Sequence, residues 1–335
     1  MITVAVIGGG GWGRNLIRNF SEIPSCRLKT ICDLNEKALA GFKAAYKGVE
    51  VTTEVSRVFA DRDVDAVVIA TDAPSHYRLA REALDAGKHV FVEKPMTLAP
   101  ADAEDLVRRA DKAGRTLMVG HLLEYHPCVL QLKDLVDQGQ LGSLRYIYCQ
   151  RLNLGVIRKD ENAWWSLAPH DVSIILYIFQ AEPVAVTAQG QAYLRPGVED
   201  VVFAQLKFAD GRMAHIHVSW FDPHKVRQVT LVGSDKMATF DDMEASEKIR
   251  IYDKGVSAAG SVVGYDQSLS IRMGDILIPK TPGGEPLRIE CLHFLECVEK
   301  GTTPRSDGRD GLRVVRVLDA ASRSLAAGGA PVTLS

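Results

Sequence analysis

Residues 6–13 read VIGGGGWG, and this stretch decides the fold of the first part of the chain. Gly8, Gly10 and Gly13 show the spacing Gly-x-Gly-x-x-Gly directly after an apolar run, residues 2–7, that is predicted to be a strand. The first glycine permits a tight turn, the second lets the backbone approach a pyrophosphate, and the third lets a helix pack closely on the strand. The helix predicted at 14–20 directs its N-terminus toward the phosphates, so the stretch predicts a dinucleotide-binding loop.

An acidic residue after the second predicted strand favours one dinucleotide over another. Asp33 follows the apolar run 28–32, where it is placed to accept hydrogen bonds from the adenosine ribose hydroxyls. Its charge repels a 2′-phosphate, and Leu34 and Asn35 offer no arginine to bind one, so NAD is favoured over NADP. Lys37 keeps NADP open, and a plain helix-capping role for Asp33 is the alternative to cofactor binding.

Two patterns of secondary structure divide the chain near residue 122. Strands alternate with helices in the first part, which predicts right-handed crossovers and a parallel sheet. The second part contains strand candidates with alternating polar and apolar residues and short turns, which favours a largely antiparallel sheet with two different faces. In the first part the further strands are predicted at 63–71, 89–93 and 116–121, and the helices at 75–86 and 100–113. In the second part the strands are predicted at 143–154, 183–193, 200–208, 213–221, 227–233 and 248–253, and the helices at 169–179, 286–299 and 310–326.

Composition excludes several classes of function. The chain has 335 residues, and 40 basic against 42 acidic side chains leave a net charge of −2. This balance gives no electrostatic reason to expect a nucleic acid or an anionic membrane surface as a partner. Six scattered cysteines without a Cys-x-x-Cys motif indicate reduced thiols, and no apolar run reaches the ~18 residues of a membrane helix. We therefore expect a cytoplasmic protein.

A lysine at the end of a buried strand is the first candidate for catalysis. Residues 89–98 read HVFVEKPMTL, in which an apolar run ends at Glu93, Lys94 and Pro95. The carboxyl ends of strands in doubly wound sheets are where ligands bind. A lysine beside a nicotinamide cation in a poorly hydrated cleft has a lowered pKa, which suits it to proton transfer. The alternative is a solvated loop lysine.

Four motifs in this order, VIGGGGWG, ATDAPSHY (70–77), VEKPM (92–96) and GHLLEYHP (120–127), resemble the glucose-fructose oxidoreductase/inositol dehydrogenase/MocA family over essentially the whole chain. The resemblance implies a Rossmann domain, a doubly wound parallel sheet at 1–122. It also implies an α+β domain at 123–335 with a large, mostly antiparallel open-faced sheet that binds substrate and other subunits. A cis Lys94–Pro95 bond is a further implication. We expect cofactor contacts from Gly8, Gly10, Gly11, Trp12, Gly13, Asp33, Thr71, His76, Glu93 and Lys94.

A second candidate for catalysis lies in the stretch NAWWSLAPHD, residues 162–171. Pro169 suits the first position of a helix, so His170 is predicted in the first turn, where the helix dipole favours a neutral imidazole. The family carries a catalytic histidine here, although Ser166 stands where many members have an aspartate, which puts the role of that aspartate in doubt. Asp171 is interpreted as an acid at the helix N-terminus.

Residues 151–171 narrow the resemblance to UDP-N-acetylglucosamine 3-dehydrogenases, which supply a 3-keto sugar nucleotide to an aminotransferase in the biosynthesis of diamino-sugar lipid A, a lipopolysaccharide component. The alternatives are a UDP-N-acetylglucosaminuronate 3-dehydrogenase, an inositol or free-sugar dehydrogenase, and a dinucleotide-binding sensor without catalysis. The uronate requires one more cationic partner, which the sequence does not identify. Substrate contacts are expected from Lys94, Tyr125, Arg158, Asn162, Trp164, Trp165, Ser166 and His170.

No metal site is expected. His215 and His217 alternate on one predicted strand and share a face, but no third ligand is visible nearby, so structural roles are favoured. The same sheet has few helices left to cover its second face, and an uncovered apolar face is typical of a subunit interface. We expect a homodimer or, in preference, a homotetramer.

Overall fold

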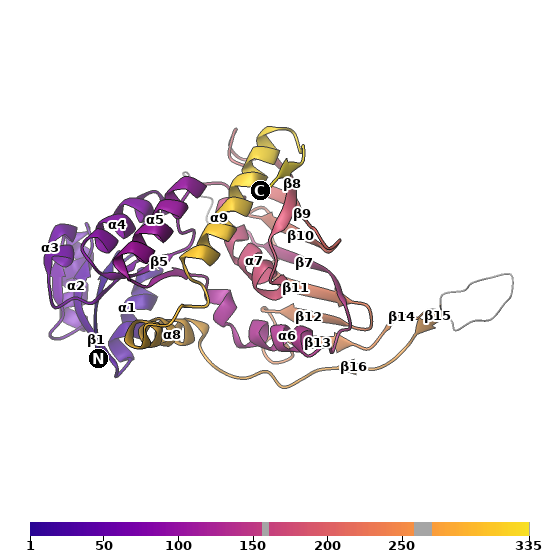
Figure 1. Cartoon of the computed structure of the whole chain (residues 1–335), viewed down its shortest axis with the longest axis horizontal. Helices are drawn as coiled ribbons and strands as arrows, with labels where there is room; N and C mark the ends of the chain where they lie inside the picture. The colour runs from indigo at the N-terminus through magenta and orange to yellow at the C-terminus, as the bar shows by residue number, and fades with distance from the viewer. Residues whose placement is uncertain (156–160, 258–269, 335) are drawn as a thin grey trace. The chain divides into compact units, whose positions relative to one another are not determined.

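The computed structural model describes residues 1–155, 161–257 and 270–334, which form two compact units (Figure 1). The first unit consists of Met1–Tyr125 and Gly284–Asp319, and the second of His126–Gly283 and Ala320–Ser335. The first break lies close to the boundary expected near residue 122. Residues 284–319 were assigned to the second domain from the sequence, and that assignment is wrong because they pack with the first unit.

The first unit contains a six-stranded sheet in the order β3-β2-β1-β4-β5-β6, and every strand pair is parallel. This is the doubly wound arrangement predicted from the alternation of strands and helices. The strands are β1 (Ile2–Ile7), β2 (Cys26–Cys32), β3 (Glu50–Thr52), β4 (Ala66–Ile69), β5 (His89–Glu93) and β6 (Leu117–Gly120). The helices are α1 (Gly13–Glu22), α2 (Glu36–Ala45), α3 (Val55–Ala60), α4 (Ala73–Asp85), α5 (Pro100–Ala113) and the short η1 (Leu122–Tyr125).

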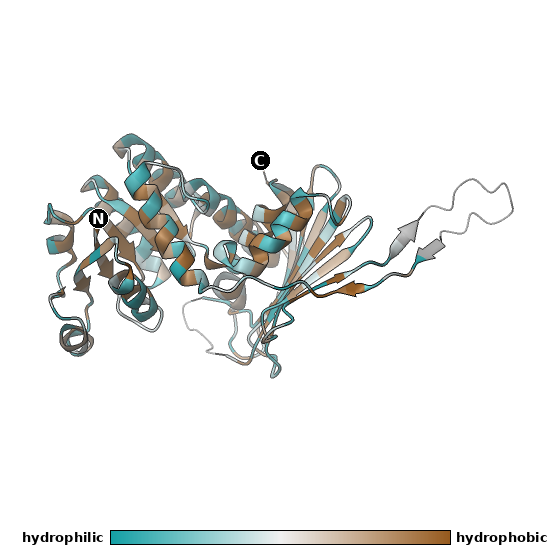
Figure 2. Cartoon of the chain, turned by 90° about the horizontal axis from the view of Figure 1, so that it is seen from below, coloured by the Kyte–Doolittle hydropathy of each residue, from teal (hydrophilic) through white to brown (hydrophobic). Residues whose placement is uncertain are grey.

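Helix α8 (Pro286–Lys300) completes the core of the first unit. Its Phe294 packs edge-to-face on Phe91 of β5 and Phe20 of α1, with ring centroids 5.6 and 6.4 Å apart. All three rings are fully buried. The free energy gained by removing them from water stabilises the packing of α8 on α1 and β5. Hydrophilic and hydrophobic residues alternate around the outer helices in Figure 2, as expected for helices that cover a sheet.

The second unit contains a nine-stranded sheet in the order β16-β13-β12-β11-β7-β10-β9-β8-β17. Every pair is antiparallel except β7 with β10, so the predicted, mostly antiparallel sheet is confirmed. Its strands are β7 (Leu144–Leu152), β8 (Pro183–Gln191), β9 (Val201–Phe208), β10 (Met213–Ser219), β11 (Val226–Gly233), β12 (Met237–Asp241), β13 (Ile249–Tyr252), β16 (Ile276–Leu277) and β17 (Val332–Thr333). The other elements are α6 (Pro127–Asp137), α7 (Ala163–Phe179), the hairpin of β14 (Gly255–Ser257) and β15 (Ser270–Arg272), and α9 (Gly308–Ala326), which begins in the first unit and ends in the second.

The two faces of the second sheet differ in what covers them. Along β9 buried residues alternate with exposed ones, and α7 packs on the strands from the buried side. The other side keeps large side chains in contact with solvent: Tyr146, Phe203 and Met213 are 45%, 45% and 42% exposed. His217 stacks on Phe203 with ring centroids 4.2 Å apart, so it acts as part of an aromatic surface. Among the described residues no helix has the length and hydropathy needed to cross a bilayer.

A buried ion pair joins helix and sheet in the second unit. Arg151 on β7 donates two hydrogen bonds to Asp171 on α7, from Nε at 2.8 Å and from a terminal nitrogen at 2.9 Å. Arg151 is 6% exposed and Asp171 is fully buried. Burial opposes the charge on Arg151, yet Asp171 outweighs it and raises the pKa of the guanidinium. The two parallel hydrogen bonds join the side chains as a bidentate fork. Removing one partner would leave the other charge buried without a counter-charge.

We expect Asp171→Asn to lower the free energy of unfolding by about 3–5 kcal/mol, the loss that follows when one partner of a buried ion pair is removed. Urea denaturation followed by circular dichroism measures the change. Glu296→Gln is the control, because it breaks a solvent-exposed pair with Lys300 that is screened by water. A change for Asp171→Asn as small as that of the control would contradict a stabilising role for the fork.

Candidate functional site

The glycine loop after β1 has the geometry that its sequence predicts. Gly8 has a φ of +96°, and a Cβ there would lie 2.5 Å from the carbonyl oxygen of Ala70. A Cβ at Gly13 would lie 2.0 Å from the carbonyl oxygen of Gly8. Both positions therefore exclude any larger residue, the first because of the turn and the second because α1 starts against the strand.

A hollow of about 460 Å³ lies in front of this loop. It is bordered by Gly9, Gly10, Gly11, Arg14, Asp33, Asn35 and Ala38. A Cβ at Gly10 would meet nothing within 4 Å, so the backbone here is open to a ligand that approaches closely. Helix α1 begins directly after this loop, and the positive end of its dipole favours an anion such as a pyrophosphate.

Asp33 borders the hollow and is held in place by the loop. Its Oδ2 accepts a hydrogen bond from the backbone N–H of Gly9 at 2.6 Å, and its Oδ1 accepts one from Asn35 at 2.8 Å. The carboxylate is thus oriented by the backbone before any ribose binds. The sequence analysis missed Arg14, which lies on α1 and borders the same hollow. The sign of this location in the sequence is that Arg14 directly follows the last glycine of the motif.

His76 and Thr71, both expected to contact the cofactor, connect β4 to the turn after β5. The ring nitrogens of His76 lie 2.8 Å from the carbonyl oxygen of Pro95 and 2.9 Å from that of Thr71. Burial lowers the pKa of His76, although both carbonyl contacts oppose that shift. Thr71 shares a hydrogen bond with Ser75 at 2.6 Å. His76 therefore holds the turn that contains Lys94.

The end of β5 is linked to the glycine loop by a side-chain hydrogen bond. The indole Nε1 of Trp12 donates to Oε1 of Glu93 at 2.6 Å, and the backbone N–H of Lys94 donates to Oε2 at 3.2 Å. Burial raises the pKa of Glu93, which is 8% exposed. Lys94 is partly buried, and the expected cis bond to Pro95 is present. Glu93 thus serves to place Trp12 and Lys94, whereas Trp12 remains 43% exposed for contact with a cofactor.

The start of α7 corrects the prediction for His170. The helix begins at Ala163, with Asn162 as its cap: the side-chain oxygen of Asn162 accepts a hydrogen bond from the N–H of Trp165 at 3.1 Å. Pro169 lies inside the helix, so His170 is not in the first turn, and the argument that the helix dipole keeps its ring neutral is wrong. His170 is partly buried, and Ser166 is 8% exposed.

Several expected substrate residues have structural partners instead. Trp164 is fully buried in the second unit, and Tyr125 is 1% exposed with its hydroxyl 2.9 Å from Oγ of Ser306. The amide of Asn162 donates to Glu199 at 2.6 Å. Trp164 and Tyr125 thus fill cores, and their contact with a ligand stays a prediction. Partly buried Trp165 donates from Nε1 to Ser322 at 2.9 Å, and Arg158 lies outside the described residues.

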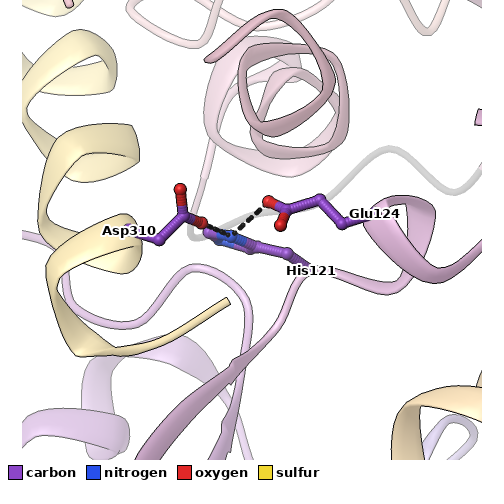
Figure 3. Close-up of side chains that lie close together, drawn as sticks. All are labelled: His121, Glu124 and Asp310. Atoms are coloured by element: carbon purple, nitrogen blue, oxygen red, sulfur yellow. Dashed lines mark hydrogen bonds and ion pairs between the residues drawn. The ribbon is translucent and has the colours of Figure 1, made fainter. Parts of the chain in front are cut away.

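A cluster of three buried ionisable groups lies in the first unit (Figure 3). Nδ1 of His121 is 2.8 Å from Oδ2 of Asp310 and 3.5 Å from Oε1 of Glu124, and the two carboxyl groups point toward the imidazole. Their ligand atoms all lie within 4.8 Å of one another, so the cluster has the donors of a cation site. The sequence analysis missed it because Asp310 is far from the other two residues in the chain.

Burial and mutual charge shift the pKa values of this cluster. Burial opposes protonation of His121, but Asp310 and Glu124 outweigh it and raise its pKa to about 9. Burial and the charge of Asp310 raise the pKa of Glu124 to about 8. At neutral pH these shifts favour an imidazolium at His121 and a carboxylic acid at Glu124. Nearby Glu290 is also buried, and its pKa is raised well above the usual range.

We expect the protein to lose stability as the pH rises through 8 and 9. The folded state keeps protons on Glu124 and His121 that the unfolded chain releases near pH 4.5 and 6.5, so their contribution is largest below these values and falls above them. Glu124→Gln mimics the protonated acid, and its melting temperature should fall less between pH 6.5 and 9. Thermal unfolding across this range measures the slope, and Glu296→Gln should keep the wild-type slope. Equal slopes for all three proteins would refute the assignment.

Two parts of the chain match models of known protein families, and the chain is similar to known enzymes. Residues 2–121 match the family described as "Oxidoreductase family, NAD-binding Rossmann fold", and residues 129–239 match the "GFO/IDH/MocA C-terminal domain". The chain is 28% identical to the UDP-N-acetylglucosamine 3-dehydrogenase of Acidithiobacillus ferrooxidans, over 81% of this chain and 84% of that protein. It is 30% identical to an inositol 2-dehydrogenase of Mycolicibacterium smegmatis, over 66% of this chain and 65% of that protein.

A solved structure agrees with these matches. The crystal form P21 of the Acidithiobacillus ferrooxidans UDP-N-acetylglucosamine 3-dehydrogenase superimposes with a TM-score of 0.84 at 26% identity, over 98% of each chain. The two matched domains, the glycine loop and the arrangement of both sheets lead to one assignment. The chain belongs to the Gfo/Idh/MocA family of NAD-binding oxidoreductases.

Proposed function

We propose that the protein oxidises the C3 hydroxyl of a UDP-sugar, with UDP-N-acetylglucosamine as the first choice, and releases a 3-keto sugar nucleotide. The observation that carries the proposal is the end of β5, where Glu93 holds both the glycine loop, through Trp12, and the backbone of Lys94. A lysine fixed to the loop that binds the dinucleotide is placed to work on a substrate beside the nicotinamide. Similarity to the Acidithiobacillus ferrooxidans enzyme supports the choice of sugar.

In the proposed mechanism the alcohol loses a hydride from C3 and a proton from its C3 hydroxyl group. Bound NAD supplies the acceptor for the hydride from C3. Lys94 accepts the proton of the C3 hydroxyl at Nζ, since it is partly buried and fixed by its neighbours. We place His170 second, because it lies inside α7, where the helix dipole gives no reason for a neutral ring. Gly10, Asp33 and the N-terminus of α1 hold the dinucleotide.

The experiment incubates the protein with NAD and, separately, UDP-N-acetylglucosamine, UDP-N-acetylglucosaminuronate, free N-acetylglucosamine and inositol, with nicotinamide absorbance as the readout. We expect a 3-keto product from the neutral UDP-sugar and far slower turnover of the free sugar, because binding energy from the nucleotide positions C3. Lys94→Ala should lower turnover by about 10²-fold or more with little change in NAD affinity. Lys112→Ala, an exposed lysine of the same unit, is the control.

Two other outcomes would replace the proposal. Inositol is the second candidate, favoured by the 30% identity to an inositol 2-dehydrogenase, and reduction of NAD with inositol alone would establish it. Tight NAD binding without turnover of any substrate would indicate a sensor. Normal turnover in Lys94→Ala together with its loss in His170→Ala would make His170 the base.

We also propose that the exposed aromatic face of the second sheet, which contains Tyr146, Phe203 and Met213, is covered by another copy of the chain in a homotetramer. The product is a ketone at a sugar carbon, which suits consumption by an aminotransferase, and both steps belong in the cytoplasm. Phe203→Glu should lower the molar mass measured by light scattering, whereas Leu292→Glu, on exposed α8, should not. A monomeric wild-type protein at micromolar concentration would end this proposal.

A further inference from the structure

Two arginines face each other across neighbouring strands of the second unit. Arg227 on β11 lies directly opposite Arg151 on β7 in the antiparallel register, so both side chains are on the same face of the sheet. This is the face that α7 covers, because Arg151 reaches Asp171 on that helix. Like charges directly opposite each other on a sheet are destabilising, so the pair requires a reason.

Among the described residues Arg227 has no ion-pair partner, although the charges of Asp242 and Asp171 partly offset its own. Its side chain is partly buried, and its Nε is shielded from solvent with no hydrogen-bond partner among the described residues. Burial, and next the charge of Arg151, lower the pKa of Arg227. A guanidinium has five N–H donors in a fixed fork, and burying it without an acceptor costs free energy.

The two carboxylates near Arg227 are already engaged. Asp171 accepts both hydrogen bonds of Arg151. Asp242 accepts a hydrogen bond from Lys248 at 3.0 Å and lies 3.5 Å from Nε2 of His126. Burial opposes the charge on Asp242, but these two partners outweigh it and lower its pKa. Among the described residues, three basic side chains (Arg151, Arg227 and Lys248) therefore share two carboxylates.

We propose that Arg227 is the anchor of an anion subsite that binds an oxyanion of the substrate, either a sugar carboxylate or a phosphate of the nucleotide. The proposal rests on the proposed function in that the substrate is a nucleotide sugar. Carboxylate and phosphate both match the guanidinium fork with two parallel hydrogen bonds. Such a group would also relieve the repulsion between Arg227 and Arg151. The subsite lies on the face of the sheet covered by α7, the helix that contains His170.

The test compares Arg227→Gln, Arg227→Lys and the control Arg145→Gln, an exposed arginine on the same strand as Arg151. For each protein, kcat/KM is measured with UDP-N-acetylglucosamine and with UDP-N-acetylglucosaminuronate. We expect Arg227→Gln to lose about 10- to 100-fold, the scale of a charged hydrogen-bonding pair, and Arg227→Lys to lose less. A loss confined to the uronate identifies the sugar carboxylate as the bound group, and an equal loss with both substrates identifies a phosphate. Values within twofold of the control for both substrates overturn the proposal.

A second measurement separates this proposal from the proposed function. Inorganic pyrophosphate and glucuronate are each added to wild-type protein and to Arg227→Gln, and the melting temperature is recorded. If no UDP-sugar turns over, the proposed function fails, but an anion that stabilises the wild type and not the variant still supports the subsite. Equal stabilisation of both proteins, or of neither, overturns it.

The melting temperature without added anion tests whether Arg227 has only a structural role. Arg227→Gln removes a positive charge opposite Arg151, so an anion-binding arginine predicts an unchanged or higher melting temperature. A melting temperature clearly below that of Arg145→Gln would show that Arg227 stabilises the fold itself, and would overturn the assignment.

Discussion

The hydrogen bond from Trp12 to Glu93 is the constraint on which the first unit's site depends. Trp12 belongs to the loop that starts α1, and Glu93 is the last residue of β5. The bond fixes these two elements to each other, and the same carboxyl group accepts the backbone N–H of Lys94. Because Glu93 is buried, its acceptor oxygens gain little from water and are held by these donors instead.

The two units satisfy buried charge in different ways. In the first unit, burial and neighbouring charges favour protons on both His121 and Glu124 beside Asp310. In the second unit, Arg151 and Asp171 form a fully ionised fork. Carboxylic acids can become neutral near physiological pH, whereas a guanidinium cannot, so an unpaired arginine must find an anion. This difference makes Arg227 a stronger indication of a ligand than the acidic cluster.

The sequence predicted the turns, strands and helices whose signals lie within a few neighbouring residues. The glycine loop, the buried strand that ends at Lys94, and helix α5, whose bounds Pro100–Ala113 agree with the prediction, all have signals within a few residues. The start of α7 was misplaced because Pro169 is typical of a first helical turn, while the tertiary structure accommodates it inside a helix capped by Asn162. As a result, Asp171 was taken for an acid at a helix end, and its pairing with Arg151 was not foreseen.

A single sequence contains no local pattern that indicates which residues far apart in the chain come into contact. Asp310 meets His121 across 189 positions, and Arg227 meets Arg151 only through strand register. The glycine loop identified the cofactor from sequence, whereas residues expected to contact substrate, such as Trp164 and Tyr125, are core residues because aromatic side chains serve both roles.

The first unit consists of two separate stretches of the chain, and this determines the order in which its parts are synthesised. A ribosome releases the first 125 residues, then the whole stretch up to Gly283, and only later the segment Gly284–Asp319 that the first unit needs. Until that segment emerges, the nascent chain exposes the aromatic surface that Phe294 later covers, and His121 has no Asp310 to bind. The unit whose synthesis begins first therefore stays incomplete until most of the second unit has been made, and apolar surface exposed during that time is prone to aggregation.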